Sequence, residues 1–319
     1  MTPSELLDAL FAPLPGAGPP GELDMRAFLK QHGPATESED RPTYFGRLVR
    51  VGLHADRRSA ASAAGHQAAI RRLFPATPDD AVVAFCVSED QGPRPAHIHT
   101  TLIPVDGGAG FVMNGTKKWG SMAPQADVRY IAASVGHEGD RNLLRMVALP
   151  SDRPGVTIDT EPYVDWGPEM RICDLAFDDV AVRADEIYPE DAYLEHIKPF
   201  RLVEDVYNTA GTQVGLLQLG RRHGWPDVWL EELVGLILRA GSLAETDLAS
   251  PAPVLALTDY LRSSEVHWTD LWRRWQEIPD GVPEQVAAAW IPERGLLGVA
   301  AKAREIRRER AWAELRAGQ

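Results

Sequence analysis

The sequence contains no long apolar run. The longest, Ala81 to Val87, has seven residues, whereas a membrane-spanning helix needs about 20. The first ten residues, MTPSELLDAL, also lack the basic-then-apolar order of a secretory signal. We therefore expect a soluble, cytoplasmic protein without a membrane partner.

Cysteine and positive charge are both scarce. Cys86 and Cys173 are the only two cysteines, and they show no metal-ligand spacing. A disulfide framework is excluded, which fits a reducing compartment, and we expect both side chains to be small core residues. Lys and Arg number 33 against 46 Asp and Glu, so the formal net charge is -13. Such a surface repels phosphate backbones, which excludes nucleic acid as the main partner.

Motifs that mark several common enzyme classes are missing. The sequence has no G-x-G-x-x-G, Walker loop, H-E-x-x-H or G-x-S-x-G, so Rossmann dehydrogenases, P-loop NTPases, zincins and α/β-hydrolases have no motif support. His97 and His99 are expected to alternate on a strand, with both rings on one face. Because no further ligand cluster accompanies them, we interpret them as a surface pair and predict no metal site.

The hydrophobic pattern divides the chain into three parts. Residues 1–80 and 191–319 have the three- and four-residue period of helices, and residues 81–190 have the two-residue period of about eight short strands. The pattern predicts an α+β protein in which an antiparallel β-barrel or sandwich lies between two helical domains. Within the β domain, Asn114-Gly115 predicts a two-residue hairpin turn, because that turn needs positive φ at both positions.

The central segment also carries a recognisable order of short motifs. It reads FVMNGTKKWGS, then PGV, then FDDVAV, and a strand ending in Ser88-Glu89 precedes them. In this order they resemble the middle domain of the acyl-CoA dehydrogenase family. The resemblance covers about Ala81 to Gly215 and implies an acyl-CoA dehydrogenase-like fold, in which FAD binds against the β domain and an acyl thioester stacks on the flavin ring.

The resemblance also implies which residues bind the cofactor. Trp119, Gly120 and Ser121 stand where the family has W-[IS]-T, which places an aromatic ring and a hydroxyl beside the flavin. Val87, Ser88 and Glu89 correspond to the family's strand and its T-E pair. The serine and aspartate that follow the next glycine in the family are Pro93 and Arg94 here. Proline removes a backbone donor, whereas Arg94 supplies a charge in another way.

A catalytic carboxylate is the next implied feature, because the family's reaction removes a proton next to the thioester carbonyl. One family position lies six residues before a glycine at the start of the C-terminal domain. Counting back from Gly211 gives Asp205, our first candidate, with Glu204 beside it. The second family position lies near the end of the chain, and Glu293 in WIPERG is the best match.

The leading functional hypothesis is therefore an FAD-dependent dehydrogenase that acts on the α,β carbons of an acyl thioester, with an electron-acceptor flavoprotein as a possible partner. Two alternatives remain. A flavin-dependent monooxygenase on the same fold needs no α-proton base, and a degenerate homologue would bind an acyl group or a partner without redox chemistry. The second follows from the absence of the family's R-x-x-F-G and G-G-x-G loops, which reach the cofactor of a neighbouring subunit.

The tryptophans bear on assembly. Seven of nine lie in the C-terminal domain, and Trp268, Trp272 and Trp275 share one predicted helix face, which is typical of a core stripe. They are numerous enough for a core and an interface together, so we expect a homodimer formed by the C-terminal helices.

Overall fold

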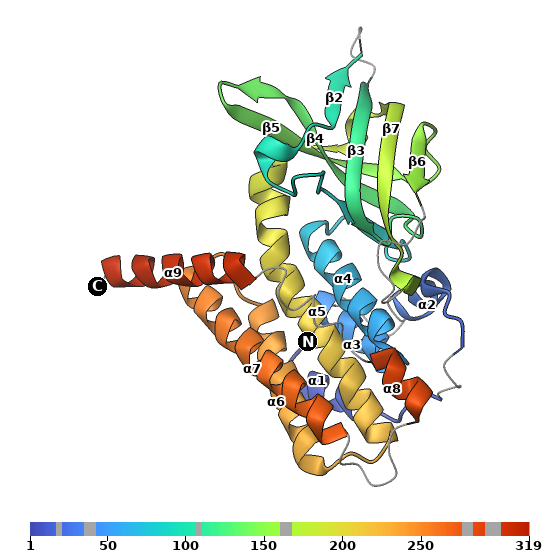
Figure 1. Ribbon diagram of the computed structural model, residues 1–319, viewed down its shortest axis with the longest axis vertical. Coiled ribbons are helices and arrows are strands. Elements are labelled where there is room, and N and C mark those ends of the chain that lie inside the picture. The colour runs from blue at the N-terminus through green and yellow to red at the C-terminus, as the bar shows by residue number, and fades with distance from the viewer. Residues whose placement is uncertain are drawn as a thin grey trace. The chain divides into compact units, whose positions relative to one another are not determined.

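The computed structural model describes residues 1–16, 21–34, 43–105, 110–159, 168–275, 283–290 and 301–318. The chain divides into two compact units (Figure 1). The helical unit comprises Met1–Leu23, Gln31–Arg72 and Leu202–Gln319, and the β unit comprises Asp24–Lys30 and Leu73–Arg201. In the parts that the structure describes, no helix is both long and apolar enough to cross a membrane.

The helical unit combines N-terminal and C-terminal segments. Its helices are α1 (Pro3–Leu10), α3 (Tyr44–Leu53), α4 (Arg58–Leu73), α5 (Lys198–Arg222), α6 (Asp227–Ala244), α7 (Pro251–Trp275), α8 (Glu284–Trp290) and α9 (Ala301–Ala317). Helix α1 begins with a capping box, because Thr2 and Glu5 bond each other's backbone N–H groups. The long helices α5, α6 and α7 lie side by side in Figure 1 and supply most of the unit's length.

Two glycines allow α4 and α5 to pack closely. A Cβ at Gly65 would lie 2.6 Å from the Cα of Asn208, and one at Gly211 would lie 3.2 Å from the backbone N of Gly65. Neither space admits a side chain without moving backbone. The small residues of α4, which is rich in alanine, are therefore the reason that this helix can lie in the core of the unit.

Tryptophans form an aromatic cluster in the helical unit. Trp225 packs edge-on against Trp229 and Trp275, with ring centroids 6.0 and 5.2 Å apart. Trp275, one member of the predicted stripe, is buried, and Trp268 is half-buried. The side chain of Trp272 lies outside the described residues.

The β unit contains one sheet of eight strands: β1 (Val83–Cys86), β2 (Thr101–Pro104), β3 (Phe111–Ser121), β4 (Val128–Glu138), β5 (Arg141–Pro150), β6 (Val156–Asp159), β7 (Ile172–Val182) and β8 (Ile187–Tyr188). Their order is β6-β7-β3-β2-β4-β5-β8, and β1 also pairs with β4. Five of the seven pairings between these strands are antiparallel; β1 and β2 each run parallel to β4.

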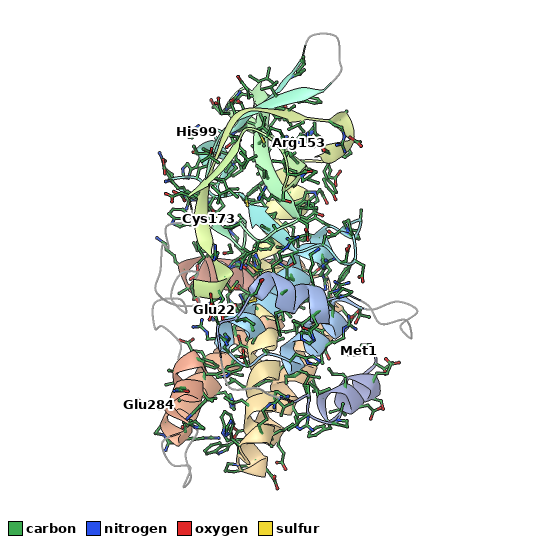
Figure 2. The ribbon with its side chains drawn as sticks, turned by 90° about the vertical axis from the view of Figure 1, so that its right-hand side faces the viewer. Met1, Glu22, His99, Arg153, Cys173 and Glu284 are labelled. Atoms are coloured by element: carbon green, nitrogen blue, oxygen red, sulfur yellow. The ribbon has the colours of Figure 1, made fainter. Side chains whose placement is uncertain are left out.

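The α+β class, with helices on both sides of the β region in sequence, is thus as predicted, and the sheet is mixed instead of wholly antiparallel. The sheet curves so that β3, β7 and β6 share one core with the β4–β5 hairpin (Figure 1). This core includes Cys86 and Cys173, both free and only 1% exposed; Figure 2 labels Cys173 on β7. Burial raises the pKa of each thiol to about 12.

Helix α2 (Met25–His32) attaches to the same unit through Asp127. The carboxylate of Asp127 pairs with Arg26 and with Lys30, the latter at 2.9 Å, and it accepts a hydrogen bond from the backbone N of Val82 at 2.8 Å. The helix is thereby fixed where β1 and β4 begin.

Two local predictions were wrong. Asn114-Gly115 is no hairpin turn, because β3 continues through it and bulges against β7. Asn114 exchanges hydrogen bonds with Asp179 at 2.7 and 3.0 Å, and Gly115, at φ 141°, leaves room for Thr100. The structure also places His97 in a 3-10 turn (Pro95–His97), so it does not alternate with His99 on a strand. Among the described residues, no three potential ligand side chains come together as a metal site.

Candidate functional site

The two segments that the sequence assigns to a cofactor lie next to each other in the β unit. One is the turn Ser88–Arg94 after β1, and the other is the end of β3, Lys118–Met122. The backbone N of Lys118 donates to the carbonyl of Ser88 at 2.8 Å. The turn closes through a hydrogen bond from the backbone N of Gly92 to the carbonyl of Glu89 at 2.7 Å. These two segments, at least 24 positions apart in the sequence, thus form one surface region, which we call the bulge site.

The β3 segment has an unusual backbone. The β3–β7 register shifts between Lys117 and Gly120, which marks a β-bulge, and Trp119 within it has φ 56°. Met122 and Arg171, joined by a hydrogen bond from the Met122 N to the Arg171 carbonyl at 3.1 Å, have φ 62° and 40°. Non-glycine residues pay a steric cost in this region, and such residues cluster at functional sites.

The bulge site combines an exposed aromatic ring with two serine hydroxyl groups. Trp119 is 47% exposed, and its indole has neither a hydrogen bond nor a ring contact with any described residue. Ser88 and Ser121 are half-buried, and their hydroxyl groups also lack hydrogen-bond partners in the described ranges. A large exposed aromatic side chain on a strained backbone, beside two free hydroxyl groups, is a surface suited to a flat polar ligand.

Glu89 points the other way, into the β unit. Its side chain is 7% exposed and its Oε1 lies 2.7 Å from the Nζ of Lys117, whose side chain is fully buried. Burial by itself raises the pKa of Glu89, but the charge of Lys117 and the hydrogen bonds to the carboxylate together hold that pKa below its usual value. Burial lowers the pKa of Lys117 to about 8 despite the nearby carboxylate. Glu89 therefore supports the site from inside and has no atom left for a ligand.

The remaining predicted residues divide by burial. Val87 is 4% exposed and packs in the core, and Gly120 is buried where a Cβ would lie 2.8 Å from the Cδ1 of Leu175. Both shape the site from behind. The side chain of Arg94 is exposed and has no ion pair with a described residue, so this cation is open to an anion.

Lys118 forms a second set of ion pairs, beside the Lys117–Glu89 pair, that the sequence did not suggest. Its Nζ pairs with Asp174 of β7 and lies 3.8 Å from a carboxylate oxygen of Asp90 in the turn. Consecutive lysines thus hold consecutive acids, since Lys117 binds Glu89 inside and Lys118 reaches Asp90 outside. Two like charges in a row usually indicate a solvated face, so the sequence alone does not reveal these roles.

The carboxylates proposed as bases lie in the helical unit. Asp205 is 4% exposed, and Arg304 of α9 binds both of its oxygens, at 2.8 and 3.2 Å. Glu204, the neighbouring residue of α5, is half-buried, and its Oε1 lies 3.1 Å from the Nδ1 of His66 on α4. Glu293 lies outside the described residues. The structure therefore gives the first candidate a strong cationic partner and the second an imidazole.

Comparison with known proteins agrees with the motif pattern. A family model described as the acyl-CoA dehydrogenase middle domain matches residues 84–180, which include the whole bulge site. The chain is similar to benzylmalonyl-CoA dehydrogenase of Aromatoleum aromaticum, at 34% identity over 116 residues, which are 36% of this chain and 29% of that protein. It is also similar to a probable acyl-CoA dehydrogenase, FadE10, of Mycobacterium tuberculosis, at 32% identity over 91 residues, 28% of this chain and 14% of that one. The matched part spans less than a third of either relative's length.

Solved structures extend the likeness to the fold of nearly the whole chain. FkbI, from the biosynthesis of a methoxymalonyl extender unit, aligns with a TM-score of 0.58 over 93% of this chain and 94% of its own, at 16% identity. An FAD-dependent dehydrogenase aligns with a TM-score of 0.59 over 85% and 83%, at 14% identity. The apo form of PigA aligns with a TM-score of 0.58 over 98% and 96%, at 15% identity. Residues 84–180 thus match the acyl-CoA dehydrogenase middle domain, and the chain has an acyl-CoA dehydrogenase-like fold.

Proposed function

We propose that the chain is a flavin-dependent oxidoreductase of the acyl-CoA dehydrogenase type, with the bulge site as the flavin-facing surface of its β unit. The observation that carries the proposal is the exposed indole of Trp119, held on a strained backbone beside the hydroxyl groups of Ser88 and Ser121. A protein retains such an arrangement at the cost of about 1–3 kcal/mol of backbone strain, which a ligand-binding role explains.

The residues of the bulge site fit the ring of a flavin. Trp119 offers an aromatic contact, Ser121 and Ser88 offer hydroxyl donors without other described partners, and Gly92, at φ 99°, has open space where a side chain would stand. The exposed guanidinium of Arg94 supplies a cation for phosphate groups. These residues bind and orient; the flavin, when bound, supplies hydride acceptance.

The proposed reaction is removal of two hydrogens from the α,β carbons of an acyl thioester. It needs a carboxylate to take the α proton. Asp205 is unsuited to this step, because a bidentate Arg304 stabilises its charge and occupies both oxygens. We assign the step to a carboxylate oxygen of Glu204, which is half-buried and whose Oε1 lies 3.1 Å from the Nδ1 of His66. We further propose an electron-acceptor flavoprotein as the physiological oxidant.

Both carboxylate oxygens of Asp205 are bound by Arg304. This ion pair favours one alternative, a flavin-dependent monooxygenase, because that reaction needs no base beside the substrate. The two are separated by the electron source. A dehydrogenase-bound flavin is bleached by the acyl thioester itself without oxygen, whereas the flavin of a monooxygenase needs an external reductant and then consumes oxygen.

The experiment begins with flavin binding. Purified protein is titrated with FAD and with FMN, and binding is followed through the absorbance near ~450 nm and the quenching of flavin fluorescence. We expect Trp119→Ala to weaken binding by about tenfold, which corresponds to about 1.4 kcal/mol. Val228→Ala, an exposed residue of α6 outside the site, is the matched control. Absence of binding at about 1 mM flavin would overturn the proposal.

A second step tests the base. Glu204→Gln should abolish anaerobic bleaching by a panel of acyl-CoA thioesters while the flavin stays bound, because an amide cannot accept the α proton. Asp205→Asn should keep the bleaching. The opposite result would return the base role to Asp205.

A further inference from the structure

Lys117, which directly precedes the β3 segment of the bulge site, is a fully buried cation. Its side chain has no solvent exposure, and its Nζ lies 2.7 Å from the Oε1 of Glu89. An ionised lysine in a protein interior is costly unless it is paired. A residue of this kind, two positions before Trp119, therefore calls for an explanation beyond its own packing.

Glu89 is the hub of a small network. In addition to Lys117, its carboxylate accepts hydrogen bonds from the backbone N of His99 at 2.8 Å and from the backbone N and hydroxyl of Thr100 at 3.0 and 2.8 Å. The Thr100 hydroxyl also donates to the carbonyl of Thr116 at 3.0 Å. One carboxylate thus joins the turn after β1, the chain entering β2, and β3.

The network ends at the two ligand-facing parts of the bulge site. Glu89 directly follows Ser88, and Lys117 is separated from Trp119 only by Lys118, whose N–H bonds the Ser88 carbonyl. The Glu89–Lys117 pair therefore joins the two segments from inside the β unit, in addition to the backbone hydrogen bond of Lys118. On the outer side, the Nζ of Lys118 also lies 3.8 Å from a carboxylate oxygen of Asp90 in the turn.

We propose that Lys117 is a positioning residue: its ammonium group, acting through Glu89, holds the turn at Ser88 and the bulge at Trp119 in the relative position that flavin binding requires. This inference rests on the proposed function, because the ligand of the bulge site is taken to be a flavin.

The charge of the pair can be changed with pH. The groups that face Lys117 are Glu89 on the turn and Cys86 on β1, and beyond Cys86 lie Arg129 on β4 and Cys173 on β7. Both thiols have a pKa near 12 and the guanidinium stays protonated, so between pH 7 and 9 Lys117, with a pKa of about 8, is the one member of this set that titrates. Loss of its proton replaces the ammonium–carboxylate ion pair with a weaker hydrogen bond from a neutral amine to the Glu89 carboxylate.

Stability and positioning respond to this titration with opposite signs. Lys117 has a lower pKa in the folded chain than in the unfolded chain, whose lysine keeps its ordinary value of 10.5. Between about pH 8 and 10.5 the unfolded state binds more protons, so the contribution of Lys117 to folding stability rises with pH. The proposal predicts that flavin binding falls over the lower part of the same interval. A residue with only a structural role would not produce this divergence.

The test uses the full chain and four variants: Lys117→Arg, which keeps the charge, Lys117→Met, Glu89→Gln, and the double variant Lys117→Met/Glu89→Met, which replaces the buried pair with apolar side chains. Lys30→Met, which removes a lysine of α2, is the control. FAD affinity is measured between about pH 6.5 and 9.5. Fluorine NMR of protein labelled with 5-fluorotryptophan reports on Trp119 without flavin, with its resonance assigned from Trp119→Phe. Urea unfolding gives the stability of each variant.

We expect wild-type affinity to fall about tenfold between pH 7 and 9, with a midpoint near 8, and the Trp119 resonance to titrate with the same midpoint. Lys117→Arg should abolish both dependences and bind FAD within about threefold of the wild type at pH 7. The double variant should fold but bind FAD at least about tenfold more weakly at every pH, because the ion pair between Lys117 and Glu89 is absent.

Three results would overturn the inference: wild-type affinity and a Trp119 resonance that do not change with pH, a double variant that binds FAD as well as the wild type, or Lys30→Met behaving like Lys117→Met. If the wild type binds no flavin at any pH, the proposed function fails instead. The fluorine resonance of Trp119 still tests the coupling to Lys117 in that case, since it is measured without a ligand.

Discussion

Trp119 has a backbone conformation that disfavours every residue with a Cβ. At φ 56° the cost is about 1–2 kcal/mol for an L-residue, and glycine avoids it. Because the indole is 47% exposed, the burial of its apolar surface offsets little of this backbone strain. The strain is thus concentrated at the residue whose side chain we assign to the ligand.

Replacing Trp119 should therefore separate stability from binding. We expect Trp119→Gly to be about 1 kcal/mol more stable than Trp119→Ala, because both lack the indole and only glycine relieves the strain, less its own entropic cost. Both should lose flavin affinity equally. Urea unfolding of the two variants checks this, and an alanine variant as stable as the glycine variant would show that the bulge relaxes around any side chain.

Asp205 is a second residue whose role can be tested by substitution, because we interpret it as the partner of an ion pair and not as a base. We expect Asp205→Asn to lower the free energy of unfolding by about 1–3 kcal/mol, because Arg304, whose side chain is 29% exposed, loses its anionic partner. Glu284→Gln, at the exposed start of α8, should change stability by less than about 0.5 kcal/mol. Equal stabilities for Asp205→Asn and the wild type would contradict the structural role.

Part of the bulge site could be predicted from sequence and part could not. The family resemblance assigned Trp119 and Ser121 to the flavin. The structure shows Trp119 exposed and Ser121 half-buried, and their role stays a prediction. The burial of Lys117 could not be predicted. Successive side chains of a strand point to opposite faces, so Lys117 and Lys118 point in opposite directions, but the sequence does not say which of them points inward. The bulge at Trp119 and the inward carboxylate of Glu89, contributed by a distant turn, decide that Lys117 is buried.

At the scale of elements, the helical and strand periods predicted the order of the fold, whereas local turn chemistry misled at Asn114-Gly115. The same positive φ that suits a hairpin turn also suits a bulge. The choice depends on partners that are far away in the sequence: Thr100 fills the space beside Gly115, and Asp179 bonds Asn114. No local pattern contains that information.

The close crossing of α4 and α5 gives a prediction for elements. Gly65→Ala should lower the free energy of unfolding by about 2 kcal/mol or more, because the new Cβ would meet backbone atoms of α5 that cannot rotate away. Gly235→Ala, on an exposed face of α6 with nothing within 4 Å, is the matched control. There alanine should stabilise the protein by about 0.5–1 kcal/mol. A Gly65→Ala variant as stable as the wild type would show that the helices separate freely.

At the scale of the whole molecule, we propose that the chain forms a homodimer through its C-terminal helices. Large apolar side chains are exposed there: Val228, Val266, Ile306 and Trp312 are 54%, 65%, 41% and 43% exposed. Scattered exposed residues are ordinary, but four on neighbouring helices of one unit favour an interface.

The predicted mass in light scattering at micromolar concentration is twice the 35.1 kDa of one chain. Val266→Glu should shift it toward one chain, because a buried unpaired carboxylate is costly at an interface. Val135→Glu, in the β unit, should leave the mass unchanged. A wild-type mass near 35.1 kDa would refute the dimer, and a mass four times larger would indicate a tetramer.

The burial of Cys86 and Cys173 has a practical consequence for handling the protein. Nucleophilic attack and oxidation require a thiolate, and thiols with a pKa near 12 inside a packed sheet stay protonated and out of reach. The folded chain should tolerate air and a weak oxidant without added reductant. Any disulfide-linked band on a non-reducing gel would then come from chains whose β unit had opened, so that the gel itself becomes a gauge of how often the sheet unfolds.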